Sequence, residues 1–185
     1  GAAVTATMTS YDPDTAAYVA TVTGNLTSDT YTYSITLQGT SGAANGATAS
    51  YVYTKLRVDL DAPTTGASIT YYADNQGPET GNYLTNTVTN DTSPTLTGTL
   101  SATLQPGERI VIERIDLTAQ PNTTTTITNL NGLVVSGTHW SFTDSGLVDG
   151  HRYTYAAHVE DAAGNQGTAS AAYRVTVDTS VPPAT

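Results

Sequence analysis

The sequence predicts an all-β protein made of two β-sandwich units in tandem, the first of them short or truncated. Composition is the first of three observations behind this expectation. The chain is rich in Thr, Val and Tyr, which favour pleated strands, and in Gly, Asn and Asp, which favour turns. Its 185 residues include no cysteine, so neither a disulfide framework nor thiol chemistry is available to it.

The second observation is an internal repeat. The stretch Tyr18–Pro63 aligns with the stretch Trp140–Pro182, and each contains a Tyr-x-Tyr pair, a Gly/Asn loop and an Asp shortly before the final Pro. The offset of roughly 120 residues suits one sandwich for each repeat. We therefore expect one unit at residues 1–62 and a complete one at residues 63–185.

The third observation is the alternation of apolar and polar residues, because a period of two is typical of half-buried strands. Residues 1–62 hold only about four such segments, so this unit is either shortened or begins partway through a domain. The second unit holds enough for a complete sandwich. Its strands are expected at residues 67–72, 95–101, 109–115, 123–128, 133–135, 139–143, 152–160 and 169–177.

A Leu-x-x-Gly-x-x-Tyr pattern, from Leu147 to Tyr153, stands at the start of the strand expected at residues 152–160. It resembles the tyrosine corner of immunoglobulin-like sandwiches, in which a Tyr near the start of the sixth strand bonds back to upstream backbone. A plain turn followed by an ordinary strand Tyr is the alternative. With the number of strands, the pattern predicts Greek-key immunoglobulin-like domains.

Charge excludes several kinds of partner. The chain has 6 Lys and Arg residues against 16 Asp and Glu, a net charge of −10, so it lacks the basic patch that nucleic acids or anionic membranes require. No apolar run approaches the ~20 residues of a membrane span, so we expect no membrane insertion. An acidic chain suits divalent cations, which take carboxylate oxygens, although acidity also simply maintains solubility.

Catalytic patterns are missing from the sequence. The histidines are His139, His151 and His158, and none is placed beside a nucleophile in a triad pattern or at a zinc-ligand spacing. His151 and His158 are an odd number of residues apart, which puts them on opposite faces of a strand. We expect a non-enzymatic protein.

Five short motifs together resemble the immunoglobulin-like repeats of giant secreted adhesins of Gram-negative bacteria, which include biofilm-associated and RTX-type adhesins. They are DLDAP at 59–63, TNDTSPTLTG at 89–98, WSF at 140–142, DAAGN at 161–165 and VDTSVP at 177–182. The resemblance covers nearly all of residues 59–182 and, more loosely, 16–58. The first unit departs from it at 39–45, where GTSGAAN lacks the acid of DAAGN.

This resemblance implies an extender domain, outside the cell or on its surface, that supports adhesion or biofilm formation. Its partners would be neighbouring repeats of the same polypeptide, with a host-cell or biofilm-matrix ligand bound elsewhere in the parent protein, and the segment itself would be a monomer. Such repeats commonly bind Ca²⁺ near domain junctions, which stiffens them.

Calcium takes six to eight oxygen ligands, so several loops must contribute to one site. We expect a junction site built from Asp59, Asp61, Asp161 and Asn165, because the linker enters the second unit at the end where the loop after residue 160 lies. The alternative is that these side chains only build turns through bonds to nearby backbone.

Two further calcium groups are possible, the first of them at the opposite end of the second unit. One combines Asp178 with the loop that carries Asp91, with Asp144 or Asp149 approaching the same region. The other is the loop Asp74–Glu79, which begins with Asp74 and does not match an EF-hand spacing.

A carbohydrate-binding or accessory module of an extracellular polysaccharide-active protein is the alternative function. Tyr71, Tyr72 and Tyr83 flank the acidic loop and are its candidate stacking residues. Such tyrosines more often pack a core or a sheet edge with the hydroxyl in water.

Overall fold

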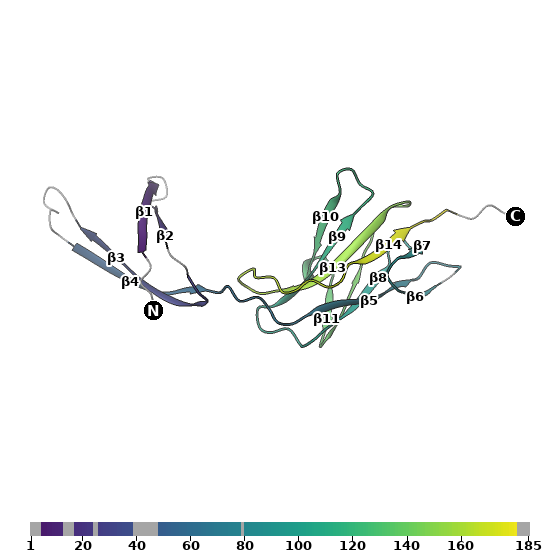
Figure 1. Cartoon of the computed structure of the whole chain (residues 1–185), viewed down its shortest axis with the longest axis horizontal. Coiled ribbons are helices and arrows are strands. Elements are labelled where there is room, and N and C mark those ends of the chain that lie inside the picture. The colour runs from purple at the N-terminus through teal and green to yellow at the C-terminus, as the bar shows by residue number, and fades with distance from the viewer. Residues whose placement is uncertain (1–4, 13–16, 24–25, 39–47, 79, 181–185) are drawn as a thin grey trace. The chain divides into compact units, whose positions relative to one another are not determined.

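A computed structural model describes the chain except for residues 1–4, 13–16, 24–25, 39–47, 79 and 181–185 (Figure 1). The chain divides into two compact units, Gly1–Asp61 and Ala62–Thr185. The GTSGAAN loop at 39–45, Glu79 and Pro182 lie outside the described residues. No helix among the described residues is long and apolar enough to cross a membrane.

The first unit consists, over its described residues, of two separate antiparallel strand pairs. β1 (Thr5–Asp12) pairs with β2 (Ala17–Thr23), and β3 (Asp29–Gln38) pairs with β4 (Thr48–Val58). The number of strands matches the expectation for a short unit.

The second unit is a sandwich of two five-stranded sheets, ordered β10-β9-β13-β14-β7 and β11-β12-β8-β5-β6 (Figure 1). Neighbouring strands are antiparallel, except that β14 and β7 are parallel. A 3₁₀ helix, η2 (Asn129–Asn131), joins β10 to β11. The strands are β5 (Ala67–Asp74), β6 (Gly81–Tyr83), β7 (Thr87–Thr89), β8 (Thr95–Leu100), β9 (Arg109–Asp116), β10 (Thr123–Ile127), β11 (Val134–Ser136), β12 (His139–Thr143), β13 (Arg152–Glu160) and β14 (Tyr173–Val177).

Strands with clear alternation lie where the sequence predicts them, and β12 and β13 match residue for residue. Two short strands, β6 and β7, were not predicted. Gly81 and Asn82 belong to residue types depleted from strands, and β7 is too short to show a period.

The last strand begins at Tyr173 and not at residue 169 as the sequence predicts. Ser170 explains the difference. Its backbone N–H donates to the Ala157 carbonyl at 2.8 Å, but the Ala157 N–H donates to the Ser170 hydroxyl at 3.0 Å in place of a backbone carbonyl. The side chain replaces one bond of the ladder, so regular pairing with β13 starts only after it.

The core of the second unit lies between its two sheets. Alternation in β13 points Tyr153, Tyr155, Ala157 and Val159 inward, each at most 3% exposed. Strands of both sheets meet there in one hydrophobic cluster. Its other large members include Tyr72, Leu96, Ile112, Trp140, Phe142, Tyr173 and Val175.

Gly98 on β8 makes room for the Trp140 ring. A Cβ at Gly98 would lie 2.2 Å from Cζ2 of Trp140 and 2.0 Å from the carbonyl oxygen of Ser68. Because such distances are far inside van der Waals contact, only glycine lets the indole lie against this strand.

The predicted tyrosine corner is present. The Val148 backbone N–H donates a hydrogen bond of 2.9 Å to the hydroxyl oxygen of Tyr153, five residues further on. Leu147 is buried beside it, and Gly150 adopts the left-handed conformation, with φ 75°, that the turn needs. The Leu-x-x-Gly-x-x-Tyr pattern therefore holds the loop onto β13 as expected.

Candidate functional site

Thr89, at the end of β7, joins two of the predicted calcium ligands. Its hydroxyl donates to Oδ2 of Asp74 at 2.6 Å and accepts from the Asp91 backbone N–H at 3.0 Å. Asp74 and Asp91 are only 5% and 2% exposed. Both carboxylates also accept backbone N–H bonds from the loops, given by Gln76 to Asp74 and by Asn75 and Ser93 to Asp91.

Asp178 follows β14 at the same end of the sandwich. Its backbone N–H donates to the Thr89 carbonyl at 2.8 Å, which continues the β7–β14 pairing by one bond. Its exposed carboxylate accepts from the hydroxyl and the N–H of Ser180, and these bonds lower the pKa of Asp178 below its ordinary value. Asp149 approaches this region as expected, since its Oδ1 accepts from the Thr179 N–H at 2.6 Å.

A cavity of about 370 Å³ opens between these loops, and Asp74, Asn90 and Asp178 belong to its wall. The structure thus brings Asp74, Asp91 and Asp178 to one end of the second unit, through Thr89. Asp144 also approaches this end, since its backbone N–H donates to the Pro94 carbonyl at 3.0 Å, but its carboxylate is buried in an ion pair described below.

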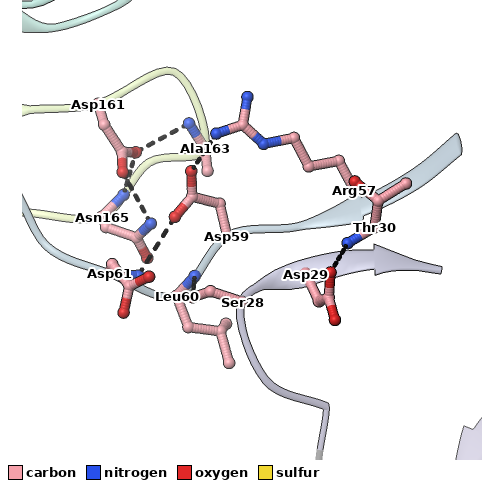
Figure 2. Close-up of polar contacts among 10 residues, drawn as sticks. All are labelled: Ser28, Asp29, Thr30, Arg57, Asp59, Leu60, Asp61, Asp161, Ala163 and Asn165. Carbon is pink, nitrogen blue, oxygen red and sulfur yellow. Dashed lines mark hydrogen bonds and ion pairs between the residues drawn. The ribbon is translucent and has the colours of Figure 1, made fainter. Parts of the chain in front are cut away.

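The loop after β13 is organised by Asp161 (Figure 2). Oδ1 of Asp161 accepts from the backbone N–H groups of Ala163 and Asn165 at 2.8 and 2.9 Å, and Oδ2 accepts from the Asn165 side-chain amide at 2.9 Å. The bond from the Asn165 amide is the main cause that lowers the pKa of Asp161. The predicted pair Asp161 and Asn165 therefore lies together in one loop.

Asp59 and Asp61 belong to the end of the first unit (Figure 2). Oδ2 of Asp59 lies 3.1 Å from Nη2 of Arg57, and Oδ1 accepts from the Asp61 backbone N–H at 3.3 Å. The neighbouring Leu60 N–H donates to the Ser28 hydroxyl at 2.8 Å. These bonds hold the last residues of the unit against the start of β3.

The predicted carboxylate ligands of the second unit all accept hydrogen bonds from their own loops, and the Asn165 side chain donates to Asp161, as turn-building side chains do. Within the part of the chain that the structure describes, no three His, Asp or Glu side chains lie close enough to hold one metal ion. The carboxylates of this unit thus fit the turn-building alternative in their present arrangement. A calcium role for them stays a prediction.

Sequence reasoning missed an ion pair between the sheets, in which Asp144 is buried and Arg114 is half-buried. Nη1 of Arg114 on β9 donates to Oδ1 of Asp144 at 2.6 Å, and the hydroxyl of Tyr155 on β13 donates to Oδ2 at 2.9 Å. Burial and the Asp144 charge raise the pKa of Tyr155 well above its ordinary value. The signal was the position of Arg114, which shares the alternation of the apolar residues Ile110 and Ile112 in β9, because a charged residue on the core-facing side of a strand needs a partner.

A second missed pair joins His151 to Asp116. Nδ1 of His151 lies 2.8 Å from Oδ2 of Asp116, while Oδ1 accepts from the N–H groups of Thr118 and Ala119. Burial acts to raise the pKa of Asp116, but these hydrogen bonds outweigh it and the pKa is lowered. The pair secures the loop after β9 against the start of β13.

The tyrosines considered for sugar stacking do not form an exposed platform. Tyr72 is completely buried in the core, so its ring cannot meet a sugar, and the prediction for this residue is wrong. Tyr83 is half-buried, stacks on Tyr72 at 5.7 Å between ring centroids, and its carbonyl accepts from the Tyr173 hydroxyl. Packing of the sheet edge accounts for Tyr72 and Tyr83.

The two-sheet architecture, the core around Trp140 and the tyrosine corner define an immunoglobulin-like β-sandwich. The family model of the bacterial Ig-like domain matches residues 67–179, which run from the start of β5 to just past β14. The chain belongs to this family. No curated protein matches the sequence of this chain. Domains of this family are generally non-catalytic and typically occur in extracellular or surface proteins.

Proposed function

We propose that the chain is a non-enzymatic extender segment of a secreted bacterial cell-surface adhesin of the RTX or biofilm-associated kind. In this role it spaces a ligand-binding part of the same protein away from the cell and so supports adhesion and biofilm formation. The observation that carries the proposal is the family membership of residues 67–179, directly preceded by another β unit. Tandem β units are what a spacer requires.

The use of polar groups in the second unit supports this proposal. The Arg114–Asp144 ion pair, the Asp116–His151 pair and the Thr89 hydrogen bonds all connect strands and loops of the unit itself. A spacer needs this kind of internal closure, because its task is to keep its shape.

The proposal includes Ca²⁺ as the stiffening ion and neighbouring repeats of the same polypeptide as partners. The net charge of −10 and the carboxylates at loop ends support it, because oxygen-rich loops are the usual calcium ligands. The candidate ligands are Asp59, Asp61, Asp161, Asn165, Asp74, Asp91 and Asp178.

A replacement experiment tests the extender role. In the bacterium that makes the parent protein, the coding segment is either deleted or exchanged for an unrelated β-sandwich pair of equal length. Adhesion should fall on deletion and return with the unrelated pair, because only length and stiffness matter. If the unrelated pair fails to restore adhesion while reinsertion of this segment succeeds, the segment binds a ligand itself and the extender proposal is wrong.

Thermal unfolding tests the calcium part separately. The purified chain is melted with Ca²⁺, with Mg²⁺ as the control ion, and with a chelator. An ion that binds only the native state at about 100 times its Kd adds about 2.7 kcal/mol of stability. We expect Ca²⁺ alone to raise Tm, and the Asp161→Asn variant to reduce the gain. A Tm that is the same in all three conditions rejects calcium and leaves the extender role untouched.

A further inference from the structure

We infer that Arg152 and Arg174, on the outer face of the second unit, form a binding site for acidic polysaccharides. The two guanidinium groups together bind one carboxylate or sulfate group of the sugar chain. The inference goes beyond the proposed extender function and does not depend on it. It follows from the way in which the few basic side chains of this acidic unit are distributed.

The arginines of the second unit fall into two pairs. Residues 62–185 contain four arginines and no lysine. Arg109 and Arg114 each lie within 2.6 Å of a carboxylate oxygen. Arg152 and Arg174 are exposed, and neither has an ion pair within the described part of the chain. Since acidic residues outnumber arginines in this unit, both unpaired cations stand where the chain supplies no acid for them.

The register of β13 and β14 places these two arginines next to each other on one face of the sheet. Arg152 is opposite Thr176 and Thr154 is opposite Arg174, so the four residues form a square with the arginines on one diagonal. All four alternate with buried core residues, which directs their side chains outward. Diagonal neighbours in an antiparallel sheet are about 7–8 Å apart, so two long side chains can reach the same ligand group.

Hydrogen bonds fix the backbone that carries both arginines. The Arg152 N–H donates to the Thr118 hydroxyl at 2.9 Å, and the Arg174 N–H donates to the Thr85 hydroxyl at 2.8 Å. The carbonyl of each arginine also accepts a backbone N–H from a neighbouring loop. Because these bonds hold the backbone before a ligand arrives, only the two side chains lose freedom on binding, which limits the entropy cost.

The residues around the arginines favour a sugar chain as the source of the anionic group. The hydroxyls of Thr154 and Thr176 can both donate to and accept from sugar hydroxyls. Val88 lies opposite Thr176 on β7 and is 58% exposed, so it offers an apolar contact to the C–H face of a sugar ring. Two arginines are too few for the phosphate contacts of a nucleic acid, and this group of residues has no aromatic anchor for a protein partner.

The net charge of −10 does not prevent an anion from binding at this site. The acids closest in register are Glu113, which is opposite Ala156, and Asp178, which lies two residues beyond Thr176. More distant charges are largely screened, because the Debye length is about 8 Å at physiological ionic strength. A carboxylate or sulfate between the two guanidinium groups meets both positive charges at hydrogen-bond distance, and this local attraction exceeds the screened repulsion.

Retention of the purified full chain on immobilised polysaccharides tests the site. The probes are polygalacturonate, which carries carboxylates, dextran sulfate, which carries sulfates, and plain dextran, which is neutral. The test variant combines Arg152→Gln with Arg174→Gln. The control variant combines Arg57→Gln with Arg109→Gln, which removes the same charge from two exposed arginines that already have carboxylate partners. Urea denaturation checks that both variants are folded.

We expect the unchanged chain to bind a charged polysaccharide and not dextran, and the preferred probe distinguishes carboxylate from sulfate recognition. The test variant should bind about tenfold more weakly, because two exposed ionic contacts are lost. The control variant should bind as the unchanged chain does.

Three results would overturn the inference. They are equal retention on dextran and on the charged probes, no retention on any probe, and equal losses in the two variants, since net charge alone would explain the last. If sedimentation instead shows a dimer that only the test variant abolishes, the arginines bind a second copy of the chain and not a polysaccharide. One site with two ionic contacts is weak, so the unrelated pair should still restore adhesion in the replacement experiment, and the two proposals fail separately.

Discussion

The hydroxyl of Tyr155 donates a hydrogen bond of 2.9 Å to the carboxylate of Asp144, across the interior of the sandwich. Tyr155 belongs to β13 of one sheet, and Asp144 directly follows β12 of the other. Since Arg114 binds the other carboxylate oxygen, the two sheets are joined here by a buried charge with two donors.

We expect Tyr155→Phe to lower the free energy of unfolding by about 2 kcal/mol, because a buried carboxylate oxygen loses its donor while the ring stays. Urea denaturation followed by Trp140 fluorescence measures the change. Tyr71→Phe, at a half-buried position on β5, is the matched control and should change stability by less than about 0.5 kcal/mol. Equal effects of the two substitutions would contradict a special role for the Tyr155 hydroxyl.

Gly98→Ala should be one of the most harmful small substitutions in the unit. The added methyl group would overlap both the Trp140 ring and the Ser68 carbonyl, and we expect a loss of about 3 kcal/mol, at the upper end for overpacking. Calorimetric Tm measures it. Gly66→Ala is the control, because its nearest new neighbour is the Ser101 hydroxyl at an ordinary 3.7 Å. A Gly98→Ala variant with the same Tm as Gly66→Ala would show that β8 shifts easily to make room for the methyl group.

Thr89→Val removes one hydroxyl that serves two buried groups. The Asp74 carboxylate loses a donor and the Asp91 N–H loses an acceptor, so we expect a loss of roughly 2–3 kcal/mol in urea denaturation. Thr126→Val, at an exposed position on β10, should be close to neutral. If Thr89→Val changed stability as little as Thr126→Val, water would have to take over the two hydrogen bonds of the Thr89 hydroxyl.

Alkaline pH should weaken the second unit through its buried tyrosines. Burial raises the pKa of Tyr72 and of Tyr173 to about 12, above the ordinary value of 10.0. Above pH 10 the unfolded chain gives up these protons more readily than the folded chain, so the stability they contribute is complete below about pH 10 and is lost as the pH rises towards 12. Urea denaturation at a series of pH values measures how steeply the free energy of unfolding falls as the pH rises. Tyr72→Phe should make this slope smaller. An unchanged slope in that variant would contradict the assignment to Tyr72.

The fold could be predicted from sequence wherever one strand face is buried. β12 and β13 alternate cleanly, and the Leu-x-x-Gly-x-x-Tyr spacing indicates the tyrosine corner that the structure contains. β6 and β7 could not be predicted, because three residues show no period and β7 exists only through its pairing with β14. Ser170 shortened β14 by a single side-chain bond that no pattern reveals.

The site residues were predictable only as far as local sequence defines them. Asp161 and Asn165 lie in one loop, so their contact follows from spacing. The link from Asp74 through Thr89 to Asp91 depends on how three strands meet. Arg114 and Asp144 are 30 residues apart and come from opposite sheets, so their pairing is visible only after folding.

The position of the arginines has a consequence for resistance to proteases. Residues 62–185 contain no lysine, and their arginines are Arg109, Arg114, Arg152 and Arg174, all within strands of the same sheet. A trypsin-like protease must take its substrate as an extended, unpaired segment, so each of these bonds becomes accessible only when a strand leaves the sheet. The rate of digestion then follows the small population of opened molecules, and the unit withstands such enzymes for as long as that sheet stays closed.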